Sequence, residues 1–154
     1  MSSEGLHRLK VWVKSRDLVV KIYREVIPLL PVDEKYILHQ QLRRSVQGIP
    51  ANIAEGYGRF YYQDNIRFCY IARGSLEETI SHLMISHELG YLKDDALNDL
   101  LAQADNLVQL INGYIAYLKR TKQGEKDFLH NKTVNEISED YLAGLNSDEI
   151  LLTD

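Results

Sequence analysis

Apolar residues recur along the chain at intervals of three and four, the spacing that places them on one side of an α-helix. The pattern is most regular in the stretch that contains Leu97, Leu100, Ala104, Leu107, Ile111, Tyr114 and Leu118. Such a narrow stripe is typical of antiparallel helices that pack in a bundle. It predicts one long helix with a single buried side.

Three earlier segments carry similar stripes, and we expect helices over about 10–27, 33–56 and 64–89. Pro28 and Pro31 end the first segment, because proline cannot donate a helical hydrogen bond. No segment alternates as a strand does. The stripes are Trp12, Val19, Ile22, Tyr23 and Val26; Leu38, Leu42, Val46, Ile49 and Ile53; and Ile66, Cys69, Leu76, Ile80 and Leu83. The pattern predicts an all-α protein, an antiparallel up-down four-helix bundle.

Polar residues and glycines predict where the helices begin and end. Asp33 is the expected N-cap of the second helix, and Gly56 with Gly58 is expected to close it. Gln63 or Asp64 must cap the third helix. These assignments place short turns between the helices, so each helix should run antiparallel to the next.

Pro50 interrupts the second helix. It deletes the bond that its amide would make to the Val46 carbonyl oxygen, which costs about 3 kcal/mol in a plain helix. The expected result is a kink, with Gly48 allowing a neighbouring backbone to approach. The alternative is a helix that ends at Ile49 and restarts.

Charge divides the chain into two parts. Residues 1–123 hold 16 Lys and Arg against 14 Asp and Glu, a net charge of +2, whereas residues 124–154 hold 2 against 8, a net charge of −6. We therefore expect a four-helix bundle over 1–123 and an acidic, flexible tail over 124–154. We expect the tail to compete with RNA for basic surface. The tail also has apolar residues at helical spacing, so a short amphipathic helix is the alternative to a flexible segment. Those apolar residues are Val134, Ile137, Tyr141 and Leu145.

Several classes of protein do not fit the composition. The chain has no apolar run long enough to span a membrane and no apolar signal core near Met1, which favours a cytoplasmic protein. Cys69 is the single cysteine, so no internal disulfide forms. His82 and His87 are five residues apart and do not share a helical face, and no metal-ligand motif occurs. We expect no catalysis, no cofactor and no metal.

A basic and aromatic group lies in and around the turn between the second and third helices. Guanidinium groups bind phosphates, and aromatic rings stack on unpaired bases. Alternatively, the aromatic side chains cap the bundle or anchor a subunit interface. The candidate nucleic-acid-binding residues are Arg43, Arg44, Arg59, Phe60, Tyr61, Tyr62 and Arg67.

One structural ion pair is also expected. Arg73 falls between Cys69 and Leu76 in the stripe of the third helix, where a buried charge needs a partner. Glu55, near the end of the second helix, is the candidate. The alternative is that the Arg73 guanidinium reaches water along its aliphatic stem.

Combined motifs over about residues 9–120 resemble the four-helix-bundle proteins encoded within intervening sequences of large-subunit ribosomal RNA genes. The residues that carry the resemblance are Leu9-Lys-Val-Trp12, Gln41-Leu-Arg-Arg44, Ile49-Pro50, Asn52-Ile-Ala-Glu-Gly56 and Tyr70-Ile-Ala-Arg-Gly-Ser-Leu76. The resemblance implies a ring-shaped homopentamer. Related accessory proteins of diversity-generating retroelements, the accessory variability determinants, bind nucleic acid and associate with a reverse transcriptase.

We therefore expect a non-enzymatic, oligomeric protein that binds nucleic acid, RNA or DNA, with RNA favoured. The alternative function is a protein-interaction scaffold, or an accessory subunit of a reverse transcriptase or another nucleic-acid enzyme.

Overall fold

The computed structural model describes residues 3–122, and the whole predicted tail lies outside these residues. Within them, every regular element is a helix and no strand occurs. Short π-helical and 3-10 segments join the α-helices between residues 22 and 36. The α-helices are α1 (Ser3–Arg8), α2 (Lys10–Lys21), α3 (Leu38–Tyr57), α4 (Tyr62–Glu88) and α5 (Asp94–Thr121).

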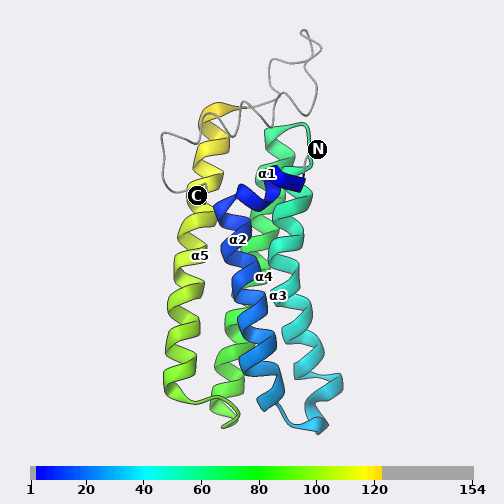
Figure 1. Cartoon of the computed structure of the whole chain (residues 1–154), viewed down its shortest axis with the longest axis vertical. Coiled ribbons are helices and arrows are strands. Elements are labelled where there is room, and N and C mark those ends of the chain that lie inside the picture. The colour runs from blue at the N-terminus through cyan, green and yellow to red at the C-terminus, as the bar shows by residue number, and fades with distance from the viewer. Residues whose placement is uncertain (1–2, 123–154) are drawn as a thin grey trace.

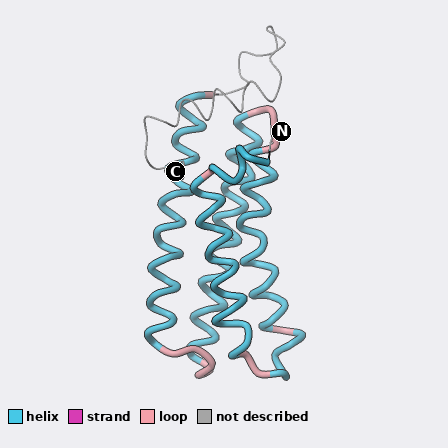
Figure 2. The backbone as a smooth tube through the Cα atoms, viewed as in Figure 1, coloured by secondary structure: helices cyan, strands magenta, loops and turns pink. Residues whose placement is uncertain are grey.

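The four long helices lie side by side, and the short α1 crosses one end of the bundle (Figure 1). The colour of the ribbon descends the bundle along α2, rises along α3, descends along α4 and rises along α5. Helix α2 packs against α3 and α5, and α4 also packs against α3 and α5. Figure 2 shows that the loops gather at the two ends. The bundle therefore has one end with the α3–α4 turn and an opposite end with the other two connections.

The buried side of α2 differs from the predicted stripe. Within α2 the structure buries Val11, Ser15 and Leu18, whereas Trp12 and Val19 are only partly buried. After α2, the predicted Ile22 and Val26 are buried as expected. Ser15 is polar, so the spacing of apolar residues does not mark its position as part of the core. Its hydroxyl donates to the Trp12 carbonyl oxygen at 2.7 Å, so the side chain can enter the core with its hydrogen bond satisfied.

Two helix starts also differ from the predictions. Residues Val32–Tyr36 form a 3-10 helix, so α3 begins at Leu38 and Asp33 does not cap it. Helix α4 begins at Tyr62, and neither Gln63 nor Asp64 is its N-cap. The cap positions are held by Ile37 and Tyr61, without a side-chain hydrogen bond.

Helix α3 is continuous through Pro50, so the alternative of a break at Ile49 is wrong. The side-chain amide of Asn52 donates to the Gly48 carbonyl oxygen at 2.6 Å, in the turn that the proline weakens. Gly56 lies inside the helix, which runs on to Tyr57, and the predicted Gly58 is its C-cap residue.

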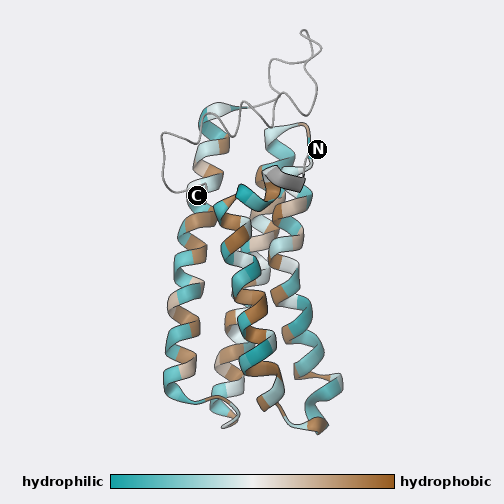
Figure 3. Cartoon of the chain, in the orientation of Figure 1, coloured by the Kyte–Doolittle hydropathy of each residue, from teal (hydrophilic) through white to brown (hydrophobic). Residues whose placement is uncertain are grey.

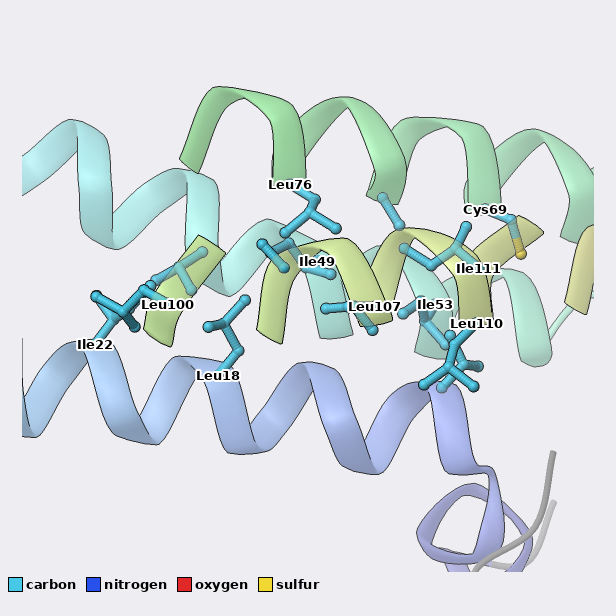
Figure 4. Close-up of a cluster of buried hydrophobic side chains, with 14 of the residues drawn as sticks. Leu18, Ile22, Ile49, Ile53, Cys69, Leu76, Leu100, Leu107, Leu110 and Ile111 are labelled. Carbon is cyan, nitrogen blue, oxygen red and sulfur yellow. The ribbon is translucent and has the colours of Figure 1, made fainter. Parts of the chain in front are cut away.

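The predicted stripes of α3 and α5 form the core, as expected. All five predicted α3 residues are buried, and in α5 every predicted residue except Leu97 is buried. Figure 4 shows side chains from α2, α3, α4 and α5 converging in one cluster. In Figure 3, hydrophobic and hydrophilic residues alternate along each long helix, as helices with one buried side require.

Helices α3 and α4 approach each other closely at two glycines. A Cβ atom on Gly48 would lie 2.9 Å from Ser75 Oγ, and one on Gly56 would lie 2.8 Å from Asn65 Oδ1. Between these helices, the buried Thr79 Oγ1 lies 3.0 Å from Ser45 Oγ. Helix α4 therefore approaches α3 closely at Gly48, as predicted, although the nearest atoms belong to the Ser75 side chain and not to its backbone.

Candidate nucleic-acid interface

The α3–α4 turn carries most of the predicted interface. Backbone hydrogen bonds close it: the Gly58 amide donates to the Ala54 carbonyl oxygen at 3.1 Å, and the Arg59 amide donates to that of Gly56 at 3.0 Å. The amide of Asp64 then bonds the Tyr61 carbonyl oxygen at 3.1 Å as α4 begins. The turn is therefore short and fixed at both sides.

The aromatic residues of this turn are not equally accessible. Tyr62 packs against the core, and Phe60 is only partly exposed. Tyr61 is 37 % exposed, and its ring meets that of Phe60 edge to face with centroids 4.9 Å apart. Among the three predicted aromatic residues, Tyr61 offers the most surface to a base.

Arg59 and Arg67 differ in their surroundings. Arg59 forms an ion pair with Glu55, one helical turn earlier, and its guanidinium carbon lies 5.1 Å from the ring centroid of Phe68. Arg67 is exposed on α4 and has no carboxylate partner within residues 3–122. Arg67 is thus free to bind a phosphate, whereas Arg59 must first leave Glu55.

Arg43 and Arg44 lie on the first half of α3, away from the turn. From Arg43 to Tyr57 the helix rises about 21 Å, at 1.5 Å per residue. The guanidinium carbon of Arg43 lies 5.5 Å from the ring centroid of Tyr23, whose hydroxyl oxygen accepts a hydrogen bond from Gln47. The structure therefore does not bring the predicted residues into one patch on a single chain.

The predicted ion pair between Glu55 and Arg73 is wrong. Glu55 pairs with Arg59, and the Arg73 guanidinium donates to the amide oxygen of Asn112 at 2.7 Å. Helix α4 turns Arg73 toward α5 instead of α3. Asn112 is neutral and lies 39 residues from Arg73, so neither its charge nor its position in the sequence marks it as the partner.

Sequence reasoning missed two residues beside Arg73. The ring of Tyr70 lies against the Arg73 guanidinium, 5.0 Å from centroid to carbon, and Lys119 of α5 reaches the same ring. Tyr70 and Arg73 share a helical face at a spacing of three, which was a usable signal. The position of Lys119 beside this ring depends on how α5 packs against α4, which the spacing of residues within one helix does not show.

Burial raises the pKa of the Cys69 thiol to about 12. The thiol is fully enclosed and donates weakly to Asn65 Oδ1 at 3.6 Å. A protonated, enclosed sulfur is a poor nucleophile, so Cys69 fills core volume.

A second cluster of charges lines an open hollow of about 490 Å³ beside α2 and α5. Hydrogen bonds to Glu25 and then Asp99 raise the pKa of Lys21, and the bond from Lys21 lowers the pKa of Asp99. Arg16 pairs with Asp17 in the same hollow. Lys21 and Arg16 thus have carboxylate partners, whereas Arg24, which also lines the hollow, has none within residues 3–122.

Residues 3–122 contain no group of three or more His, Cys, Asp and Glu side chains that could share a metal ion. In the same part of the chain, none of the helices combines the length and the apolar character needed to cross a membrane.

The sequence pattern of the 23S rRNA-intervening sequence protein family matches residues 7–113, more than half of the chain. The chain belongs to this family. The match runs from the end of α1 into α5 and leaves the last turns of α5 and the acidic tail outside the family pattern. The resemblance expected from the motifs is thereby confirmed.

A solved structure shares the family's fold. It is a protein with unknown function from the S23 ribosomal protein family from Bacteroides thetaiotaomicron, 23% identical, with a TM-score of 0.63. The similarity covers 68% of this chain and 97% of that one. The comparison with curated proteins gave no match.

Proposed function

We propose that this protein is a non-enzymatic, oligomeric RNA-binding bundle of the cytoplasm. The observation that carries the proposal is the set of exposed arginines Arg43, Arg44 and Arg67, none of which has a carboxylate partner within residues 3–122. Guanidinium groups free of a carboxylate are available for the fork-shaped contact with a phosphate. The link of the family to ribosomal RNA genes favours RNA over DNA.

The proposed assembly is a ring of five up-down antiparallel bundles. The alternating direction of the long helices in Figure 1 supports the topology. Exposed apolar residues on the second half of α4 and at its C-cap are suited to contact another subunit. They are Met84, Ile85 and Leu89. The number five comes from the family resemblance.

Assembly would compensate for the separation of the arginines. Arg43 and Arg44 lie about 21 Å along α3 from the turn near Arg67, so one chain presents two small basic groups. Repeating both groups around a ring lets one RNA contact several copies, which raises the apparent affinity through avidity.

RNA binding by the triple variant Arg43→Ala/Arg44→Ala/Arg67→Ala tests the proposal. Fluorescence anisotropy with a labelled single-stranded RNA should give a weaker affinity and a smaller salt dependence. The slope of log K against log salt should fall by about 0.7 per lost contact, about 2 in all. Circular dichroism should be unchanged, because the three side chains are exposed.

The triple variant Lys14→Ala/Arg24→Ala/Lys93→Ala is the matched control, since it removes the same number of exposed positive charges from other parts of the bundle. It should retain most of the affinity. A triple variant that folds and keeps the salt slope of the unaltered protein would contradict the assignment of these arginines.

A scaffold role is the second candidate, and one surface favours it. The connection between α2 and α3 exposes four large apolar side chains close together in sequence, and Val32 is 82 % exposed. The four residues are Leu29, Val32, Tyr36 and Ile37. Such a patch fits a protein partner, for example a reverse transcriptase. Co-purification with an enzyme encoded beside this gene, lost in Val32→Ser/Ile37→Ser, would support the scaffold role.

A further inference from the structure

Charge is distributed unevenly along the pair of helices α4 and α5. Residues 65–76 and 106–122 contain no Asp or Glu, and they hold five Lys and Arg: Arg67, Arg73, Lys119, Arg120 and Lys122. Residues 77–105 hold one Lys against seven Asp and Glu, a net charge of −6. The beginning of α4 and the end of α5 lie at the same end of the bundle, beside the α3–α4 turn (Figure 1). The pair of helices is therefore basic at that end and acidic toward the opposite end.

Tyr70 lies in the basic part of this pair, and its ring contacts two cations from different helices. On α4, the Arg73 guanidinium carbon is 5.0 Å from the ring centroid. On α5, Lys119 Nζ is 5.8 Å from the same centroid and donates to the Tyr70 hydroxyl oxygen at 3.2 Å. Tyr70 is 41 % exposed, so a ligand can reach its side chain. An accessible aromatic ring thus lies beside two positive charges.

Neither of these two charges has a carboxylate partner within residues 3–122. The Arg73 guanidinium donates to the neutral amide oxygen of Asn112 at 2.7 Å, and Lys119 donates to the neutral hydroxyl of Tyr70. Arg67, one turn before Tyr70 on α4, also has no carboxylate partner in the described part of the chain. Positive charges grouped in this way attract a polyanion.

The exposed ring favours one kind of polyanion. Aromatic side chains stack on unpaired bases, whereas the bases of a duplex are already stacked on one another. Arg67 and Arg73 are six residues apart, about 9 Å along α4 at 1.5 Å per residue, so the charges fit an extended row of phosphates better than a single anion. An acidic protein segment would offer carboxylates to the cations but no base to the ring.

We infer that Tyr70, Arg73 and Lys119 form a contact site for single-stranded RNA, which we call the Tyr70 site. An unpaired base stacks on the Tyr70 ring, and the two cations bind the phosphates on either side of it. This inference rests on the proposed function and names the form of RNA that the bundle takes. Because Arg67 is one turn away, a single strand can contact Arg67 and the Tyr70 site together. The acidic residues of 77–105 repel the strand from the opposite end of the bundle.

The affinity for a fluorescently labelled single-stranded RNA tests the stacking contact. Tyr70→Leu removes the ring and keeps every charge, so the affinity should fall at least about fivefold while the slope of log K against log salt stays the same. The control is Tyr36→Leu, which removes another exposed tyrosine beside a cation, Lys35, at the opposite end of the bundle. It should bind RNA as the unaltered protein does. Both tyrosines are exposed, so circular dichroism should show that both variants fold.

The two cations are tested by the salt dependence of binding. Arg73→Gln/Lys119→Gln should lower the slope of log K against log salt by about 0.7 per lost phosphate contact. The control Lys35→Gln/Lys93→Gln removes the same charge from exposed positions at the opposite end and should keep the slope. A duplex of the same RNA sequence should bind more weakly than the single strand, and Tyr70→Leu should not weaken its binding further.

Photo-crosslinking locates the contact without any substitution. A single-stranded RNA that carries 4-thiouridine is irradiated with the unaltered protein, and the adducts are mapped by mass spectrometry of peptides. The adducts should include Tyr70 or a residue next to it in the chain. Adducts found only on other surfaces would overturn the inference.

The outcomes separate this inference from the proposed function. Single-stranded RNA bound equally well by Tyr70→Leu and Tyr36→Leu would overturn the inference and leave the proposed function standing. No binding of RNA by the unaltered protein would overturn both. Binding of poly-glutamate that Arg73→Gln/Lys119→Gln abolishes, with RNA affinity unchanged, would assign the surface to an acidic protein and overturn the inference.

Discussion

The side-chain amide of Asn65 on α4 donates a hydrogen bond to the hydroxyl oxygen of Tyr114 on α5, over 3.0 Å in the interior of the bundle. Both side chains are buried, and Tyr114 is among the largest fully buried residues. Asn65 also accepts from the Cys69 thiol, so two polar groups of α4 and one of α5 satisfy one another. This contact aligns the two helices just below the α3–α4 turn.

Removing the Tyr114 hydroxyl should destabilise the fold. The variant Tyr114→Phe loses the bond from Asn65 and leaves a buried amide short of an acceptor, so unfolding should require about 1 kcal/mol less free energy. Urea denaturation followed by circular dichroism measures the difference. Tyr36→Phe, at a position that is highly exposed, should have no measurable effect. Equal stability of the two variants would show that the buried bond contributes little.

Two glycine-to-alanine changes should have opposite signs. In Gly56→Ala the new Cβ would lie 2.8 Å from Asn65 Oδ1 and 2.9 Å from Phe68 Cβ, so α3 and α4 must separate. We expect a loss of about 1–3 kcal/mol. In Gly74→Ala the new Cβ meets nothing within 4 Å, and the helix should gain about 0.5–1 kcal/mol. Thermal unfolding distinguishes the two, and a stable Gly56→Ala would disprove the close approach.

The buried Cys69 thiol should make stability depend on alkaline pH. Its pKa is about 12 in the folded chain and 9.0 for an ordinary thiol. Between these values the unfolded chain releases the proton and the folded chain keeps it, so stability is retained below pH 9 and falls as pH rises toward 12. The slope from this one group is at most about 1.4 kcal/mol per pH unit. Urea denaturation at several alkaline pH values should show a shallower decline for Cys69→Ala.

Removing residues 124–154 should tighten RNA binding at low salt. The deleted segment carries a net charge of −6, which repels the negatively charged RNA. The gain should vanish at high salt, where charges are screened. Filter binding across a salt series measures this gain in affinity. The control is Glu136→Gln/Glu139→Gln/Asp140→Asn, which removes negative charge from the tail without changing its length. Weaker binding, or a smaller oligomer by light scattering, would instead make the tail a structural element.

The helix content could be predicted from the sequence because apolar spacing dominates where one side of a helix is buried. The predicted stripe of α5 is buried apart from Leu97, because large apolar side chains mark most of it. The buried side is wider than predicted, since it also includes Leu110, Ile115 and Tyr117. The predicted stripe of α2 differs from its buried side, because Ser15 occupies a core position with its hydroxyl bonded to its own helix. A polar residue whose hydrogen bond is satisfied within its own helix can be buried, and the hydropathy pattern does not identify it.

The candidate interface was less predictable, because it depends on contacts between segments far apart in the chain. The individual arginines could be named from their local context. Their partners could not be named in this way. Arg59 forms an ion pair with Glu55, and Arg73 donates to Asn112, 39 residues away. The contact between Tyr70 and Lys119 also depends on how α4 and α5 lie side by side, which no local sequence pattern encodes.

The hydroxyl pair of Ser45 and Thr79 determines which turn of α3 faces which turn of α4. Both groups lie in a zone that excludes water, with Ser45 Oγ donating to the Leu42 carbonyl oxygen and Thr79 Oγ1 within reach of the Ser75 carbonyl oxygen. If α4 slid by one turn, apolar side chains would still meet apolar side chains, but these hydroxyls would part and the small surface of Gly48 would no longer face Ser75. The pair therefore fixes the position of α4 relative to α3 along the bundle axis. The basic groups on the outside of the two helices keep fixed positions along that axis as a result.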